Sequence, residues 1–251
     1  MGRKFILEIF RHPPKDGDRL KIPQGTRMAQ NIAAGIASFH EREGRPLSEV
    51  DFKIFRAAAY RTHQALDIVA RDLQGKGANV RDMTETQLGT HPSYLDSAIA
   101  DEDAFKAFQE KLPPREAERM WIRGEKVPGT KPREEDLNRM LRQFFRFGHV
   151  FLLQHPEFFD SKGNTIHVAG FSHDPKLSSF MDNVLEVTGK PKESLLEEGE
   201  GVRLVFEKAK KTASNPAGYS VSMAFRGKKR RLTQSQVKQL LELAKAPPVS
   251  P

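Results

Sequence analysis

Apolar positions recur along the chain in two patterns, one typical of strands and one typical of helices. Short apolar, β-prone runs predict buried strands at residues 4–10, 51–56 and 165–171, and a further short strand is expected at 79–82. Apolar residues spaced three and four apart predict amphipathic helices over residues 26–40 and 60–73, and from residue 174 or 175 onward. Strands and helices therefore alternate through much of the chain.

The last fifty residues show a different order of elements. Residues 202–207 and 219–226 alternate between apolar and polar side chains, which predicts an antiparallel pair of strands. The capping box that begins at Thr233 and ends at Gln236 predicts a final helix. Taken with the alternating elements before it, this order predicts an α/β fold with three layers, α/β/α, and a mostly parallel sheet with an antiparallel edge.

Residues from about 92 to 160 interrupt this alternation. They are highly charged, rich in helix-forming residues and broken by prolines, and a helix is expected to begin near Glu134. We interpret the stretch as a helical insertion into a single domain over residues 1–246, and we expect residues 247–251 to be a disordered tail. A chain of 251 residues is long enough to bury one such core.

Composition narrows the possible classes of protein. The chain has no cysteine, which excludes disulfides and thiol catalysis, and no apolar run approaches the length of a membrane span. We therefore expect a cytoplasmic protein that does not act at a membrane. The net charge of +8 is carried by residues 203–231, where nine Lys or Arg accompany one acid. That segment is interpreted either as a solvated edge hairpin that resists aggregation or as a surface for nucleic acid.

Cationic and imidazole side chains stand where two of the predicted strands end. The first strand ends in Arg11-His12, and the strand at residues 165–171 is followed by Ser172-His173. Open α/β sheets bind their ligands at the carboxyl edge of the strands. A ligand site is therefore expected where these residues lie.

A second arginine stands at the start of a predicted helix. Arg61 begins the segment Arg61-Thr-His-Gln64-Ala65. Guanidinium groups stay charged and bind phosphate through two hydrogen bonds, so Arg11 and Arg61 together suit a phosphoryl group. His63 lies two positions from Arg61 and faces elsewhere on the helix, so we expect it to be structural.

In this order, these segments resemble the histidine phosphatase (phosphoglycerate mutase-like) superfamily over most of the first 225 residues. Arg11-His12 matches the family's opening strand, Arg61 begins a helix like that of its second arginine, and His173 ends a strand like that of its second histidine. Pro13 stands where the family usually has glycine. The resemblance implies that His12 is the nucleophile, that Arg11, Arg61 and His173 bind the phosphoryl oxygens, and that His173 also stabilises the transition state.

The general acid has two candidates. In one branch of the family a glutamate follows the second arginine by a helix and a strand, and Glu85 resembles it. In the acid-phosphatase branch an aspartate follows the second histidine, as Asp174 does here. Asp174 is equally well placed to cap a helix, and Glu85 could be a solvated loop residue. We favour Glu85, because the size of the chain and the Arg61 motif are closer to the first branch.

The sequence thus predicts a phosphomonoesterase that forms a phosphohistidine on His12 without a metal or cofactor. Its substrate would be a phosphorylated small molecule or a phosphoprotein, and a mutase is a variant of the same chemistry. The alternative is an inactive relative that binds a phosphorylated partner or RNA through its cationic pocket or basic hairpin. A metal site on His167 and His173 is disfavoured, because the two lie six residues apart and no carboxylate cluster completes the site.

Overall fold

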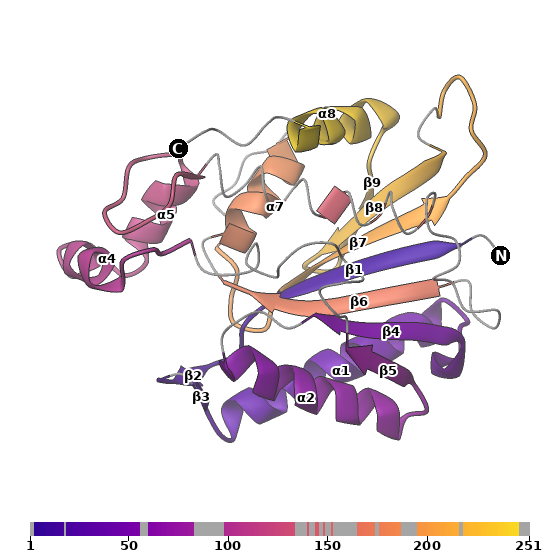
Figure 1. Ribbon diagram of the computed structural model, residues 1–251, viewed down its shortest axis with the longest axis horizontal. Coiled ribbons are helices and arrows are strands. Elements are labelled where there is room, and N and C mark those ends of the chain that lie inside the picture. Colours follow the sequence, from indigo (N-terminus) through magenta and orange to yellow (C-terminus); the bar gives the residue numbers. More distant parts are fainter. Residues whose placement is uncertain are drawn as a thin grey trace.

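The computed structural model of the 251-residue chain places most of the predicted elements (Figure 1). It describes residues 3–17, 19–55, 60–82, 98–133, 140, 144–145, 148, 152, 165–173, 176–186, 195–215 and 218–245. The helix expected near residue 134 and the tail at 247–251 lie outside the described residues. None of the helices in these ranges is long and apolar enough to cross a bilayer.

A seven-stranded sheet forms the middle layer, with the strand order β5-β4-β6-β1-β7-β8-β9. The strands are β1 (Lys4–Arg11), β4 (Val50–Phe55), β5 (Asn79–Asp82), β6 (Thr165–Ser172), β7 (Gly201–Lys208), β8 (Tyr219–Phe225) and β9 (Lys228–Arg231). β5, β4, β6 and β1 are parallel to one another, whereas β7, β8 and β9 add as an antiparallel edge. The predicted α/β fold with a mostly parallel sheet and an antiparallel edge is confirmed.

Helices cover both faces of the sheet. α1 (Gln24–Arg42) and α2 (Tyr60–Gly75) lie on one face, and α7 (Lys176–Glu186) and α8 (Gln234–Lys245) lie on the other (Figure 1). Alternation along β1 follows from this arrangement, because Phe5, Leu7 and Ile9 join the core under α7 and α8 while Phe10 joins the core under α1 and α2. All eight residues of β6 are buried, as expected for a parallel strand with both faces covered.

Two short helices lie beside the end of the sheet at which β1 and β6 finish (Figure 1). They are α4 (Glu102–Gln109) and α5 (Glu116–Ile122), and they fall within the stretch interpreted as an insertion. Phe105 and Trp121 are buried in a small apolar cluster of their own, and Trp121 Nε1 donates to the Lys131 carbonyl oxygen at 2.8 Å. This part of the chain thus has its own apolar core next to the sheet.

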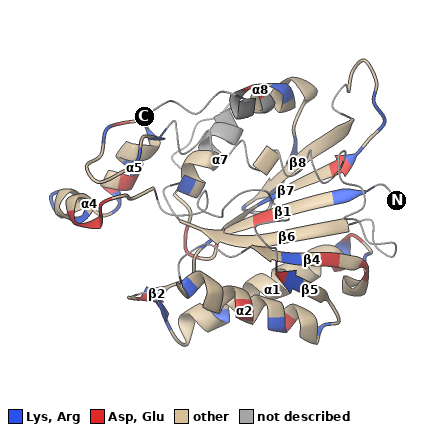
Figure 2. Cartoon of the chain, viewed as in Figure 1, with Lys and Arg blue, Asp and Glu red and all other residues tan. Residues whose placement is uncertain are grey.

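Strand β9 was not foreseen from the sequence pattern. Its four residues are all Lys or Arg, so they show no apolar alternation, and the strand forms through backbone pairing with β8. The turn between the two strands puts Arg226 at φ 45° and Gly227 at φ 72°, a left-handed pair typical of tight hairpins. Figure 2 shows further cations on the loop that joins β7 to β8.

The start of α8 has the predicted capping box. Gln236 N–H donates to Thr233 Oγ1 at 3.2 Å, and Thr233 N–H donates to Gln236 Oε1 at 2.8 Å. Each side chain satisfies a backbone donor that the first helical turn leaves without a partner. Two smaller hairpin strands, β2 (Lys15–Asp16) and β3 (Arg19–Leu20), and a 3-10 turn η1 (Leu47–Glu49) complete the described elements.

A chain of polar side chains runs through the core between α1 and the sheet. Arg203 on β7 donates two hydrogen bonds to Glu8 on β1, at 2.9 and 2.7 Å. His167 Nε2 on β6 lies 3.2 Å from Glu8 Oε2, and His167 Nδ1 lies 2.9 Å from His40 Nε2 on α1. The Arg203 guanidinium also packs 3.9 Å above the Phe39 ring. Glu8, His40 and His167 are buried, so the charge of Glu8 is compensated by Arg203 rather than by water.

This network predicts that acid destabilises the fold. Burial, followed by the nearby His167, Arg203, Arg45 and Lys4, lowers the pKa of His40 to about 2, and burial lowers the pKa of His167 despite Glu8. The unfolded chain binds these protons near pH 6.5 and the folded chain does not, so the stabilisation is complete above that pH and is lost as the pH falls below it.

Between pH 6.5 and its folded-state pKa of about 2, His40 should therefore reduce the free energy of unfolding by about 1.4 kcal/mol per pH unit, and the lowered pKa of His167 adds a loss in the same direction. Urea unfolding at pH 8, 7, 6 and 5 measures this effect. We expect little change between pH 8 and 7 and a marked loss between pH 6 and 5. Equal stability at pH 7 and pH 5 would mean that the two imidazoles are protonated in the folded state.

Candidate functional site

The two histidines predicted for the site meet at the carboxyl ends of β1 and β6. The strands pair in parallel with Arg11 opposite Ser172, so the residues that follow each strand leave the sheet side by side. The His12 backbone N–H continues the ladder by donating to the Ser172 carbonyl oxygen at 3.1 Å. The His12 and His173 ring centroids are 5.1 Å apart. The parallel pairing therefore brings together two imidazoles that are far apart in the sequence.

A backbone carbonyl defines the orientation of the His12 ring. His12 Nδ1 lies 2.9 Å from the Pro13 carbonyl oxygen, and because a carbonyl can only accept, Nδ1 carries the proton. In the neutral ring the lone pair is then on Nε2. Burial is the main reason that the pKa of His12 falls to about 4; the bond to Pro13 opposes the shift, and Arg61 and Arg11 add to it. At neutral pH, His12 therefore presents an uncharged nitrogen with a free lone pair.

Arg61 defines the tautomer of the second histidine in the same way. It stands in the first turn of α2, is buried, and places Nη2 3.3 Å from His173 Nδ1. Because a guanidinium only donates, His173 Nδ1 accepts, and neutral His173 carries its proton on Nε2. Burial, the His12 ring and the Arg61 cation lower the pKa of His173 to about 2. His173 is thus a neutral hydrogen-bond donor.

Arg11 lies on the other side of the β1 end. Its Nη1 donates to the Leu196 carbonyl oxygen, which belongs to the segment that leads into β7. Its charge acts on the His12 ring, because it contributes to the lowered pKa of that residue. Three of the predicted phosphate-binding and catalytic groups, His12, Arg61 and His173, thus form one cluster, and Arg11 flanks it.

Two lysines near the cluster were missed at the level of sequence. Lys15 is exposed on β2, and its charge helps to lower the pKa of both His12 and His173. Lys176 is 1% exposed at the first position of α7, and it also lowers the pKa of His173. Each lysine follows a histidine of the site by three residues, and this repeated spacing was the signal available in the sequence.

The other predicted groups fall into two sets. Glu85 and Asp174, the candidate acids, lie outside the described residues. His167 is not near His173, because it bonds to His40 in the core and stands on β6 six residues before His173, which follows the end of that strand. Within the part of the chain that the structure describes, no group of three His, Asp or Glu side chains is arranged to hold a metal ion.

Together, the described side chains could bind an anion next to the lone pair of His12 Nε2. The surroundings of the two neutral imidazoles are cationic, because Arg61 and Lys15 act on both rings and Arg11 acts on His12. A cationic environment of this kind favours a phosphate dianion, and the lone pair on His12 Nε2 is then available to attack it.

Comparison with solved structures identifies the fold. "Mycobacterial hydrolase 1" matches with a TM-score of 0.53 and 12% identity, over 91% of this chain and all (100%) of that chain. "Mycobacterial hydrolase 2" matches with a TM-score of 0.51 and 10% identity, over 97% of this chain and 98% of that chain. A phosphoglycerate mutase from Bacillus anthracis matches with a TM-score of 0.48 and 11% identity, over 96% of this chain and 98% of that chain.

The two mycobacterial hydrolases, with TM-scores above 0.5, share the α/β fold of this chain at 12% and 10% identity, and the fold class predicted from the sequence is confirmed. No protein-family profile matches the sequence. No curated protein sequence matches it either.

Proposed function

We propose that this protein is a phosphomonoesterase that works through a phosphohistidine on His12. The observation that carries the proposal is the tautomer of His12, with Nδ1 held by the Pro13 carbonyl and Nε2 left with its lone pair beside Arg61 and His173. Nε2 attacks phosphorus, and the ester P–O bond breaks as the N–P bond forms. Water then attacks phosphorus, the N–P bond breaks, and inorganic phosphate leaves.

The neighbouring groups stabilise the charge that develops on the phosphoryl oxygens. Arg61 and Arg11 supply guanidinium donors, His173 donates from Nε2, and Lys15 adds a cation at the exposed side. Donors that are already in place require no reorganisation at the moment of reaction, which is why such sites accelerate phosphoryl transfer. In a mutase the phosphoryl group would return to the substrate; here we propose transfer to water.

The experiment that tests this function is hydrolysis of an aryl phosphate, with and without EDTA. We expect turnover that survives the chelator, since the cations and imidazoles of the site do the work that a metal ion does in other phosphatases. Turnover that is lost with EDTA and restored by zinc or magnesium would contradict a metal-independent mechanism.

Arg61→Ala is expected to reduce kcat/KM about a hundredfold or more. It removes one charged donor from the phosphoryl oxygens and leaves His173 Nδ1 without the group that defines its tautomer. Arg61→Lys should restore only part of the rate, because an ammonium group cannot present two parallel donors. Steady-state kinetics on an aryl phosphate measure both variants. Wild-type rates in either variant would show that Arg61 does not contact the transferred group.

The leaving oxygen needs a proton, and we propose Glu85 as its donor, with Asp174 as the alternative. Glu85→Gln should depress turnover severely on alkyl phosphates and much less on aryl phosphates, whose leaving groups depart without a proton. Asp174→Asn should leave this leaving-group dependence unchanged. If the two variants exchange behaviour, Asp174 is the acid. If neither variant changes the dependence, both carboxylates are structural.

A protein that binds phosphate without turning it over is the second candidate function. The exposed cations Lys228, Lys229 and Arg231 on the edge strand β9 extend this candidate to RNA. The same strand position also suits protection against edge-to-edge aggregation. RNA binding that weakens steeply as salt rises, in a protein without phosphatase activity, would favour this candidate over the enzyme.

A further inference from the structure

The segment 195–200 joins the apolar cluster around α5 to the core of the sheet. Leu195 is buried in the cluster that contains Trp121, whereas Leu196 is buried in the core that contains Leu177 and Phe180 of α7. Adjacent residues therefore have their side chains in two different cores. A displacement of α5 would be transmitted directly to the backbone at these residues.

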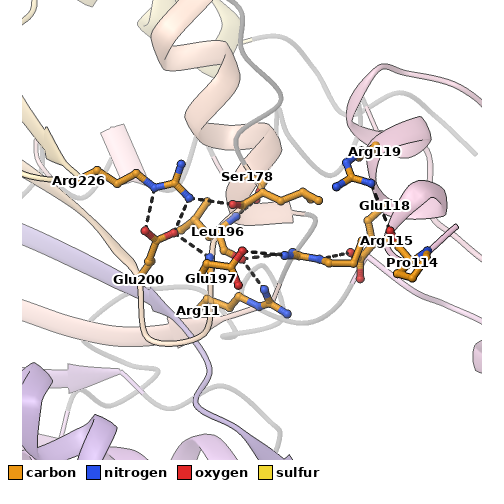
Figure 3. Close-up of polar contacts among 11 residues, drawn as sticks. Arg11, Pro114, Arg115, Glu118, Arg119, Ser178, Leu196, Glu197, Glu200 and Arg226 are labelled. Carbon is orange, nitrogen blue, oxygen red and sulfur yellow. Dashed lines mark hydrogen bonds and ion pairs between the residues drawn. The ribbon is translucent and has the colours of Figure 1, made fainter.

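The same segment holds Arg11. The Arg11 backbone N–H donates to the Glu200 carbonyl oxygen at 2.8 Å, and the Gly199 N–H donates to the Arg11 carbonyl oxygen at 3.1 Å. The Arg11 side chain returns to the segment, because Nη1 donates to the Leu196 carbonyl oxygen (Figure 3). Leu196 N–H in turn donates to Ser178 Oγ at 2.9 Å. The Leu196 carbonyl therefore holds one nitrogen of the Arg11 guanidinium.

Arg115 also reaches this carbonyl, from the start of α5 (Figure 3). Its Nη2 donates to the Leu196 carbonyl oxygen at 3.2 Å, its Nε donates to Glu118 at 2.8 Å, and its Nη1 lies 3.5 Å from Glu197. Two guanidinium groups thus share one acceptor, and the carboxylates of Glu118 and Glu197 offset the charge of Arg115. The contacts come from three separate nitrogens, an arrangement that a lysine cannot reproduce.

The backbone at Arg115 is unusual. It has φ 64° and ψ 10°, a left-handed conformation that costs a non-glycine residue about 1 kcal/mol or more. Arg115 precedes α5, so this conformation directs its side chain toward residues 196 and 197 rather than along the helix. Strain of this kind persists where the surrounding contacts determine the conformation. Here one of those contacts is the hydrogen bond to the Leu196 carbonyl, which also accepts from Arg11.

We propose that Arg115 is a positioning residue for the phosphate site, acting through the Leu196 carbonyl on Arg11. Through this contact, the position of α5 affects the position of the Arg11 guanidinium beside His12. The proposal rests on the proposed phosphatase activity for its main readout. It requires no contact between Arg115 and the substrate.

A double-mutant cycle tests the proposal. Arg115→Ala should lower kcat/KM for an aryl phosphate about 10- to 100-fold, because a small displacement of a positioned group is enough to cause such a loss. In an Arg11→Ala background the same substitution should have no further effect, since Arg115 acts only through Arg11. Arg119→Ala is the matched control, because Arg119 lies on α5, four residues after Arg115, but contacts Pro114 and Glu116 instead of the segment 195–200. It should retain the wild-type rate.

Wild-type kinetics in Arg115→Ala, or equal losses in the presence and absence of Arg11, would overturn the proposal. If Arg115→Ala does not fold, Arg115→Lys takes its place, since it retains the charge near Glu118 and loses the three-way contact. If the wild type hydrolyses no phosphate ester, the proposed function has failed. The double-mutant cycle is then measured on the dissociation constant for vanadate. We expect the same coupling between Arg115 and Arg11. Additive effects of the two substitutions on vanadate binding would contradict the proposal.

Discussion

Alanine at position 12 is expected to reduce phosphomonoester hydrolysis to the limit of detection while the protein stays folded. His12 follows the end of β1 and contributes Nε2 as the proposed nucleophile. The Pro13 carbonyl holds its Nδ1, so Nε2 carries the lone pair that would attack phosphorus. Without it, the N–P bond cannot form. Rapid acid quench of the wild type should trap a phosphoenzyme that is stable in base and labile in acid, and the variant should trap none.

The matched control is His63→Ala. His63 stands on α2 two residues after Arg61, and we assign it no part in the site. It should retain turnover and the trapped phosphoenzyme. Near-normal turnover in His12→Ala would rule out the phosphohistidine mechanism. If His12→Ala loses its cooperative unfolding transition as well as its activity, the variant is unfolded and the test is repeated with His12→Asn. Asparagine keeps a polar side chain at this buried position.

The largest effect on stability is expected from Glu8→Ala. Glu8 lies in the middle of β1, is 6% exposed, and accepts two hydrogen bonds from Arg203 as well as the contact from His167. Removing it leaves the guanidinium of Arg203, whose side chain is only 14% exposed, without its carboxylate. Loss of one partner of a buried ion pair costs about 3 kcal/mol or more, because the remaining charge is desolvated without compensation.

Urea unfolding at neutral pH measures this loss, with Glu207→Ala as the control. Glu207 lies on β7 with its side chain 46% exposed, and it faces Lys4 at 3.7 Å. A surface pair of this kind contributes about 1 kcal/mol or less, so the control should remain close to the wild type. Equal stability of Glu8→Ala and the wild type would mean that water already solvates Arg203 in the folded protein.

Local sequence pattern was enough to predict most of the strands and helices and the sheet edge at which His12 and His173 lie. Apolar runs such as Phe5–Phe10 are short and β-prone, and helical spacing in α1 and α2 is unambiguous, so local pattern was sufficient there. Because parallel strands end at one edge, His12 and His173 were expected to lie close together before their pairing was known. β9 was missed, since a run of four cations pairs through its backbone and carries no apolar signal.

Which nitrogen of each imidazole is available depends on contacts that form only in the folded protein. The His12 tautomer depends on the Pro13 carbonyl, and the His173 tautomer depends on Arg61, which reaches it from another helix. The pairing of His40 with His167 and the shared Leu196 carbonyl of Arg11 and Arg115 join residues that are remote in the sequence. Hydrogen bonds depend on distances and angles of a few tenths of an ångström, and a one-dimensional pattern of side chains does not contain those geometries.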